Sequence, residues 1–327
     1  MIFICKNCGG TTVYDPDVQK MHCSYCDGLD SEEIRKSEQM SACPSCGAPV
    51  EAGKVSLAKK CDNCGNYIIF DERVEGESRP HLILPFMIGR DKMKELLQQE
   101  FRKKVFMPDS FLSERKLQTI EGIYVPFWLY DLDTDMEYEG KGTSVRVWNS
   151  GEMEYTETSF YSVNRKMKAE FTRVPVDASL NMEDGIMDLM EPYDYSALSD
   201  FKEKYLSGFL GEKYGLNAEE LEKRASEKAQ LDTENLLNNS IQGYQSVTPV
   251  RKDFRTNIKI KEYALMPVWK YDYQYRGKQY LFHINGQTGK IIGDVPISLP
   301  KAIVYSLTVF LGCGALIQLV LSFLGVL

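Results

Sequence analysis

Eight cysteines near the N-terminus have the residue type and the spacing to bind metal. They form two copies of one Cys-x2-Cys-x14-Cys-x2-Cys pattern, offset by 38 residues: Cys5, Cys8, Cys23 and Cys26, then Cys43, Cys46, Cys61 and Cys64. Four thiolates on two facing turns make a closed tetrahedral set, which structural Zn²⁺ prefers. The sequence therefore predicts two zinc ions in two zinc ribbons, over residues 1–27 and 41–70.

The same cysteines have other interpretations. Iron in a rubredoxin-like site uses the same four sulfur ligands, so spacing alone leaves iron open. Disulfides need an oxidising compartment, and no signal peptide precedes Cys5, so we expect reduced thiols in the cytosol. A redox Cys-x-x-Cys would not come as four pairs.

Three of the four Cys-x-x-Cys turns end in glycine, at Gly9, Gly47 and Gly65, and the fourth has Asp27 there. Glycine lets the backbone turn beneath a metal with positive φ, which directs amides at sulfur. We expect a left-handed conformation at the three glycines, and Asp27 is a mild departure from the pattern.

The charge of this region bears on nucleic-acid binding, a common role of zinc ribbons. Residues 1–80 carry nine Lys and Arg against thirteen Asp and Glu, a formal charge of −4, within a chain of −8. Affinity for nucleic acid comes mainly from neutralising phosphates with basic side chains. Only Lys54, Lys59 and Lys60 gather in a basic spot, so a nucleic-acid partner is disfavoured.

The C-terminal segment 302–327 has no charged side chain in 26 positions. A helix of that length exceeds the roughly 30 Å hydrocarbon core of a bilayer. The sequence predicts a single-pass transmembrane helix that holds residues 1–300 on the cytosolic side of the cell membrane. Lys301 fits a cytosolic flank, and Cys313 lies inside the span, away from the predicted metal sites.

Between these ends, residues 81–298 alternate helical and extended patterns, which predicts an α+β domain after the polar linkers 28–40 and 71–80. An internal repeat marks this domain, because Pro126-Phe-Trp128-Leu-Tyr130 matches Pro267-Val-Trp269-Lys-Tyr271 at an offset of 141. We expect two β-meander units, at about 120–177 and 260–298, separated by helices. Two echoes extend each unit: Glu139-Gly-Lys141 with Arg276-Gly-Lys278, and Val174-Pro-Val176 with Val295-Pro-Ile297.

No group of residues predicts catalysis or nucleotide binding. Asn285-Gly-Gln-Thr-Gly-Lys290 superficially looks like a phosphate loop, but a Walker A motif needs glycine where Ile284 stands. Asp131, Asp133 and Asp135 alternate on one strand face, which is more typical of a solvated face than of a metal cluster. Helical patterns at 201–209 and 216–237 predict packing helices. We predict a protein that is not an enzyme.

Together these features resemble a group of bacterial membrane proteins with a TFIIB-type zinc ribbon, often labelled primosomal-helicase-like or phage-replication proteins. The resemblance covers nearly the whole chain through the ribbons, Glu191-Pro-Tyr193, Pro267-x-Trp269, the Asn285–Lys290 segment and the terminal span. It implies partnership with SPFH-type (flotillin-like) or PspA-type proteins of membrane-stress operons.

Two functions follow as hypotheses. The first is a membrane-anchored adaptor or scaffold that recruits proteins through its ribbons and its α+β body. The alternative is a membrane-tethered nucleic-acid-binding protein.

Overall fold

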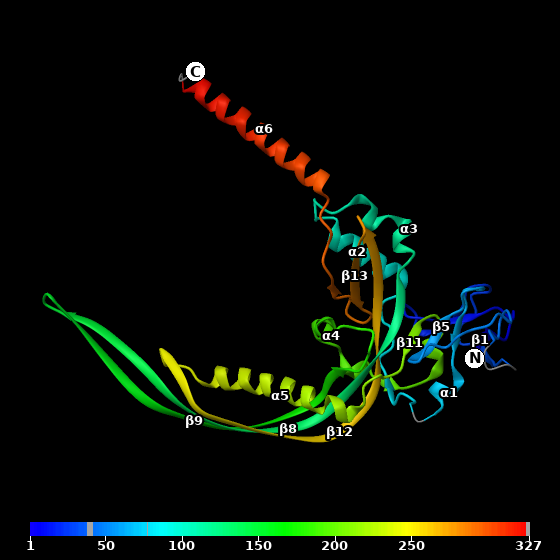
Figure 1. The fold of residues 1–327 in the computed structure, drawn as a ribbon, viewed down its shortest axis with the longest axis horizontal. Helices are drawn as coiled ribbons and strands as arrows, with labels where there is room; N and C mark the ends of the chain where they lie inside the picture. The colour runs from blue at the N-terminus through cyan, green and yellow to red at the C-terminus, as the bar shows by residue number, and fades with distance from the viewer. Residues whose placement is uncertain (38–41, 77, 325–327) are drawn as a thin grey trace.

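The chain folds into an α+β body with two cysteine modules on one side and one projecting helix (Figure 1). This computed structural model describes residues 1–37, 42–76 and 78–324. The predicted α+β class of residues 81–298 is confirmed. Parts of four predicted regions lie outside the described residues: 38–40 of the first linker, 41 of the second ribbon, 77 of the second linker and 325–327 of the terminal span.

One ten-stranded sheet runs through the body and into the second cysteine module. Its strand order is β10-β7-β12-β8-β11-β5-β6, with β9 beside β8, and with β13 and then β14 beside β12. Its strands are β5 (Ser56–Lys60), β6 (Tyr67–Ile69), β7 (Leu82–Ile83), β8 (Glu121–Ser150), β9 (Met153–Asp177), β10 (Ser199–Asp200), β11 (Leu210–Glu212), β12 (Ser246–Tyr275), β13 (Lys278–Asn285) and β14 (Ile291–Ile292).

Helices pack on this sheet or connect its strands, except α6, which projects from the body. They are α1 (Asp71–Val74), α2 (Arg90–Phe101), α3 (Glu114–Leu117), α4 (Asp184–Met190), α5 (Ala218–Ser240) and α6 (Leu299–Phe323), with the 3₁₀ turns η1 (Asp109–Leu112), η2 (Tyr195–Ala197) and η3 (Glu203–Leu206). The predicted helix at 216–237 is α5, which begins with a capping box between Asn217 and Glu220. The predicted helix at 201–209 is wrong. Only η3 forms there, because Gly208 adopts φ +97° and ends the turn.

The two copies of the Pro-x-Trp-x-Tyr motif lie side by side at the centre of the sheet. Strands β8 and β12 run antiparallel, and Val125 pairs with Met266, its own counterpart at the 141-residue offset. On either side of this pair, Tyr124 pairs with Pro267 and Pro126 pairs with Leu265, so each residue faces the counterpart of its neighbour's neighbour. A pseudo-two-fold axis therefore passes through that pair.

Hydrogen bonds repeat about this axis. The repeated bonds are Ala178 N to Pro126 O (3.0 Å) with Gly286 N to Pro267 O (2.9 Å), and Trp128 Nε1 to Leu216 O with Trp269 Nε1 to Ile88 O (both 3.0 Å). Each indole holds the loop that leads into a helix, α5 for Trp128 and α2 for Trp269. The aromatic positions of the motif are therefore core anchors that fix where a helix begins.

Each half of the duplication covers the other half. Strand β7 precedes β8 in the chain but pairs in parallel with β12, whereas β11 precedes β12 and pairs in parallel with β8. The helices exchange in the same way. Phe101 of α2 packs edge-on against Phe282 of the β12–β13 hairpin, at 5.6 Å between centroids. Helix α5 packs its Leu221 and Ala225 with Tyr130 of β8.

The downstream echoes of the predicted repeat are wrong. Gly140 lies within β8, whereas Gly277 lies in the turn between β12 and β13 with φ +78°. Val295-Pro-Ile297 forms no strand. Asp177 pairs with Phe127, and Asn285 pairs with Val268, the residue 141 positions after Phe127; Asn285 is therefore the structural counterpart of Asp177. The first expected meander is only the long hairpin β8–β9, whereas the second is the shorter hairpin β12–β13 continued by the two-residue strand β14. The unequal lengths of the two hairpins are the reason that residue spacing is not preserved after the motif.

The longer hairpin forms a curved arm (Figure 1). Strands β9, β8 and β12 run side by side, and β9 alone spans 25 residues, about 80 Å along its contour. Helix α5 covers one face, while Asp133 and Asp135 on the other face form ion pairs with Lys259 and Lys168. These carboxylates are part of a solvated, charge-paired face, and β8 continues past them to Ser150 rather than entering a turn.

The cysteine modules are joined to the body by more ordered structure than the two predicted polar linkers implied. Residues 28–40 contribute β4 (Glu32–Arg35), which pairs with β1 (Ile2–Cys5), and β2 (Thr12–Asp15) pairs with β3 (Lys20–Cys23). Strand β5 of the second module pairs with β11. The expected linkers therefore contain ordered elements, β4 and α1, because both modules bury apolar side chains against neighbours.

Helix α6 projects from the body, with no other described element packed beside it (Figure 1). It is 25 residues long with a mean hydropathy of 2.0 in its most apolar window, and none of that window is buried. It is long and apolar enough to cross a membrane.

The pseudo-symmetry generates a prediction at Asp177, which is fully buried and has one carboxylate oxygen without a hydrogen-bond partner. Burial raises the pKa of Asp177 to about 7, so the protonated form is favoured in the folded state. The folded state keeps the full benefit of a protonated Asp177 below about pH 4 and loses that benefit as pH rises towards 7. We expect Asp177→Asn, which copies Asn285, to raise the free energy of unfolding by roughly 2–4 kcal/mol at pH 8. The gain should shrink by about 1.4 kcal/mol per pH unit below pH 7.

Urea unfolding of the full chain in detergent, followed by circular dichroism, measures both values. The exposed Asp135→Asn is the matched control and should change little. A gain at Asp177→Asn that does not vary between pH 5.5 and pH 8 would contradict the buried-acid account.

Candidate metal centres

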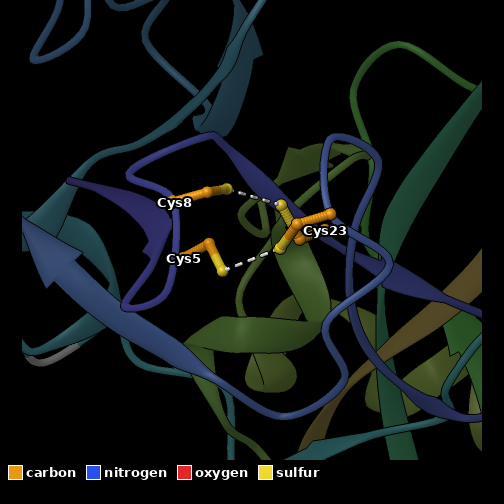
Figure 2. A group of neighbouring side chains, drawn as sticks. Cys5, Cys8 and Cys23 are labelled. Carbon is orange, nitrogen blue, oxygen red and sulfur yellow. Dashed lines mark hydrogen bonds between the residues drawn. The ribbon is translucent and has the colours of Figure 1, made fainter.

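The first cysteine tetrad brings four sulfur atoms together from two turns. Cys5 ends β1 and Cys8 lies in the turn after it, while Cys23 ends β3 and Cys26 lies in the turn after that strand. The Cys5–Cys26 and Cys8–Cys23 sulfur separations are 3.6 and 3.5 Å, and all four atoms lie within 4.8 Å of one another. Figure 2 shows the sulfur atoms of Cys5, Cys8 and Cys23 pointing toward one another.

The second tetrad repeats this geometry. Cys43 and Cys46 come from the loop before β5, and Cys61 and Cys64 from the turn between β5 and β6. The Cys43–Cys64 and Cys46–Cys61 sulfur separations are 3.7 and 3.8 Å, and again all four lie within 4.8 Å. The structure thus assembles the eight predicted residues into the two predicted groups.

These separations fit a bound metal. A metal–sulfur distance of about 2.3 Å places the sulfurs of a tetrahedron about 3.8 Å apart, close to the four observed values. A disulfide would need sulfurs about 2.05 Å apart, and all eight cysteines are free. Each group can therefore hold one metal ion with no rearrangement of the chain.

All four turns share one backbone geometry. Gly9, Gly47 and Gly65 adopt φ of 75°, 72° and 77°, as expected from the sequence, and Asp27 adopts the same left-handed conformation with φ 55°. In each turn the amide of this residue donates to the carbonyl of the first cysteine, for example Gly9 N to Cys5 O at 2.8 Å. An L-residue is costly in this conformation, and Asp tolerates it better than most.

N–H groups point at the sulfurs and stabilise thiolates. The Asn63 side chain donates to Cys46 Sγ at 3.5 Å, and this bond is the largest cause that lowers the pKa of Cys46 to about 6. The amide of Tyr25 contributes most to lowering the pKa of Cys23 to about 7. A metal binds the thiolate form of cysteine, so these donors favour metal binding. Asn63 was missed from the sequence, although its place inside a Cys-x-x-Cys turn is a usable signal.

One apolar cluster joins the first module to the second tetrad. Cys43 and Cys61 are buried with Ile2, Ile4 and Ile68, so the first module packs directly on the second tetrad. In both groups two cysteines are buried and two are exposed. This pattern is typical of a closed structural site whose ligands are shared between core and surface.

The other singled-out residues lie apart from these groups. Lys59 forms an ion pair with Asp62 at 3.0 Å, and Lys60 lies over the Tyr67 ring at 5.9 Å. The Asn285–Lys290 segment is the turn between β13 and β14, where Lys290 Nζ donates to Glu191 O at 2.6 Å. Cys313 lies on α6. The basic spot on the second module is thus partly neutralised from within.

Comparison with known proteins places the chain in a family. It is 31% identical over 308 residues to the uncharacterized protein YdjG of Bacillus subtilis (strain 168), covering 91% of this chain and 90% of that protein. The chain belongs to the same family as YdjG. No protein-family profile and no solved structure matches it.

The geometry predicts two metal ions per chain. Elemental analysis of the purified full chain should give a metal-to-protein ratio of two, and also identify the metal. Cys8→Ser and Cys46→Ser should each reduce the ratio to one, because each removes a ligand from a different group. Cys313→Ser is the matched control and should keep two. A wild-type ratio near zero, or equal loss in the control, would contradict the two-site assignment.

Proposed function

We propose that this protein is a membrane-anchored scaffold on the cytosolic face of the cell membrane, which recruits partner proteins through its cysteine modules and its α+β body. One observation carries the proposal. A continuous sheet connects the second cysteine module to a long arm, and an apolar helix whose most apolar window has no buried residue leaves the same body. Such an arrangement suits the presentation of surfaces at a fixed place relative to a membrane.

The anchor is α6. Its 25 residues extend about 38 Å at 1.5 Å per residue, enough for a roughly 30 Å hydrocarbon core. A helix satisfies its own backbone hydrogen bonds, as a membrane span must. The single pass leaves residues 1–300 in the cytosol, where thiols remain reduced.

Zinc is the metal that we assign to both tetrads. A closed set of four thiolates is the usual structural zinc site and leaves no open position for catalysis. The ions would hold the modules in shape, since segments of this size cannot fold on their own core alone. The eight cysteines are the residues with a role that the proposal specifies.

The arm supplies a surface for partners. Trp148 and Tyr155 near its tip are 41% and 43% exposed, and their rings stack at 5.6 Å. Among the described residues, β9 pairs only with β8, so its outer edge is open to an added strand. The resemblance noted above favours SPFH-type or PspA-type proteins as the partners.

The anchor generates a direct prediction. Removal of residues 299–327 should move the protein from the membrane pellet to the soluble fraction after a high-pH carbonate wash, because the apolar helix is lost. A chimera in which an unrelated apolar span of 25 residues replaces α6 should return to the pellet. If the truncated chain stays in membranes while folded, α6 is not the anchor.

The scaffold role predicts partners that depend on the arm. We expect Trp148→Ser/Tyr155→Ser to lose proteins that co-purify with the full chain from nuclease-treated, mild-detergent membranes. This variant is sharper than a ligand change such as Cys43→Ser/Cys46→Ser, because β5 belongs to the central sheet and a ligand change would disturb the body. The affinity tag belongs at the C-terminal end, since the Met1 amine is buried against Ile69 and Asp71.

Lys223→Gln, on the exposed face of α5, is the control and should retain all partners. Loss of all bound material on nuclease treatment would favour the nucleic-acid alternative, and that binding should weaken steeply with salt. Partners that survive unchanged in the arm variant would place recruitment on the modules instead.

A further inference from the structure

The end of the body from which α6 leaves is basic and apolar, although the chain as a whole has a net charge of −8. Arg102, Lys103 and Lys104 directly follow α2, and Val105 and Phe106 come next. All five side chains are exposed, Val105 by 60% and Phe106 by 37%. A run of three cations followed by two exposed apolar side chains does not suit a purely aqueous surface.

This segment is fixed to the first turns of α6. Ser298 N donates to Phe106 O at 2.6 Å, and the Phe106 ring contacts Tyr305 edge-on at 5.3 Å between centroids. Lys301 Nζ donates to Met107 O at 2.8 Å. The cations therefore lie where the chain passes from the body into the apolar helix.

The tip of the β12–β13 hairpin belongs to the same end of the body (Figure 1). Ser110 Oγ and the Tyr273 hydroxyl are 2.7 Å apart, which ties the hairpin to the segment after Phe106. Arg276 and Lys278 flank the turn and are exposed. Asp109, in the same segment, forms an ion pair with Lys301 at 2.5 Å.

We propose that this end is a docking platform for anionic phospholipids, formed by Arg102–Phe106, Arg276 and Lys278. The proposal rests on α6 as the membrane anchor. Where α6 enters a bilayer, its base meets the headgroups, so the platform faces them. Basic side chains attract an anionic leaflet, and Val105 and Phe106 reach the acyl boundary as interfacial apolar residues do.

The platform gives the scaffold an orientation that a single helix does not. One spanning helix can itself tilt and rotate in the bilayer and would carry the attached body with it. A second contact beside it, made with headgroups, fixes the body upright and therefore sets the direction in which the arm projects. The docking is electrostatic, so it weakens with salt and with loss of anionic lipid, whereas insertion of α6 does not.

Hydrogen–deuterium exchange on the full chain in nanodiscs tests the platform. One preparation contains phosphatidylcholine alone, and the other contains about one-third phosphatidylglycerol. We expect slower exchange over residues 101–109 and 275–279 only with the anionic lipid. Arg102→Gln/Lys103→Gln/Lys104→Gln should abolish that difference, because three such charges contribute on the order of 100-fold to the docking equilibrium.

The control variant removes the same charge elsewhere. Lys166→Gln/Lys168→Gln/Lys223→Gln changes side chains that are 81%, 88% and 88% exposed on the arm and α5, and it should keep the lipid-dependent protection. Protected α6 amides with no lipid dependence at 101–109 would overturn the platform and leave the anchor intact. Failure of α6 to insert would overturn both.

Discussion

Each half of the body lends a strand and a helix to cover the hairpin of the other half, and this reciprocal packing holds the whole body together. Strand β7 and helix α2 precede β8 in the chain, yet they pack on the β12–β13 hairpin. Strand β11 and helix α5 precede β12, yet they pack on β8–β9. Neither half can bury its own hairpin. The favourable burial of apolar surface is thus gained only when both halves are present, which makes the body one cooperative unit.

The metal modules share in this cooperativity. Strand β5 connects the second tetrad to β11, and β11 pairs with β8 near the pseudo-two-fold axis. Cysteines of the second tetrad lie on either side of β5, so a metal bound there would also fix this part of the sheet. In the first module, Tyr14 packs edge-on with Tyr205 of the body at 4.9 Å. Metal binding would stabilise these edges through the sheet, because folding and metal binding are coupled.

The duplication is symmetric at its centre and unequal at its ends. The two hairpins leave the axis in opposite directions, and one is short and lies beside α6 while the other extends as the arm. A common core thereby serves two purposes, since one end has the basic and apolar surface beside α6 and the other has exposed aromatic side chains and open strand edges. Duplication followed by change in hairpin length explains how one fold carries both.

Sequence patterns alone predicted the two tetrads, the positive φ of the glycines in their turns, the long apolar helix, the α+β class and the central repeat. Each depends on local chemistry or on regular spacing: cysteine pairs in tight turns, the absence of charge over 26 positions and a shared aromatic motif. Four features emerge only from the fold. Each half packs its strand and helix on the other half, and β4 pairs with β1. Residues 201–209 form no long helix, and Asp177 is equivalent to Asn285, so the two Val-Pro segments are not equivalent. Those features depend on strand pairing between distant residues, where two hairpins of unequal length shift the spacing, and no local pattern encodes which segment will cover which face.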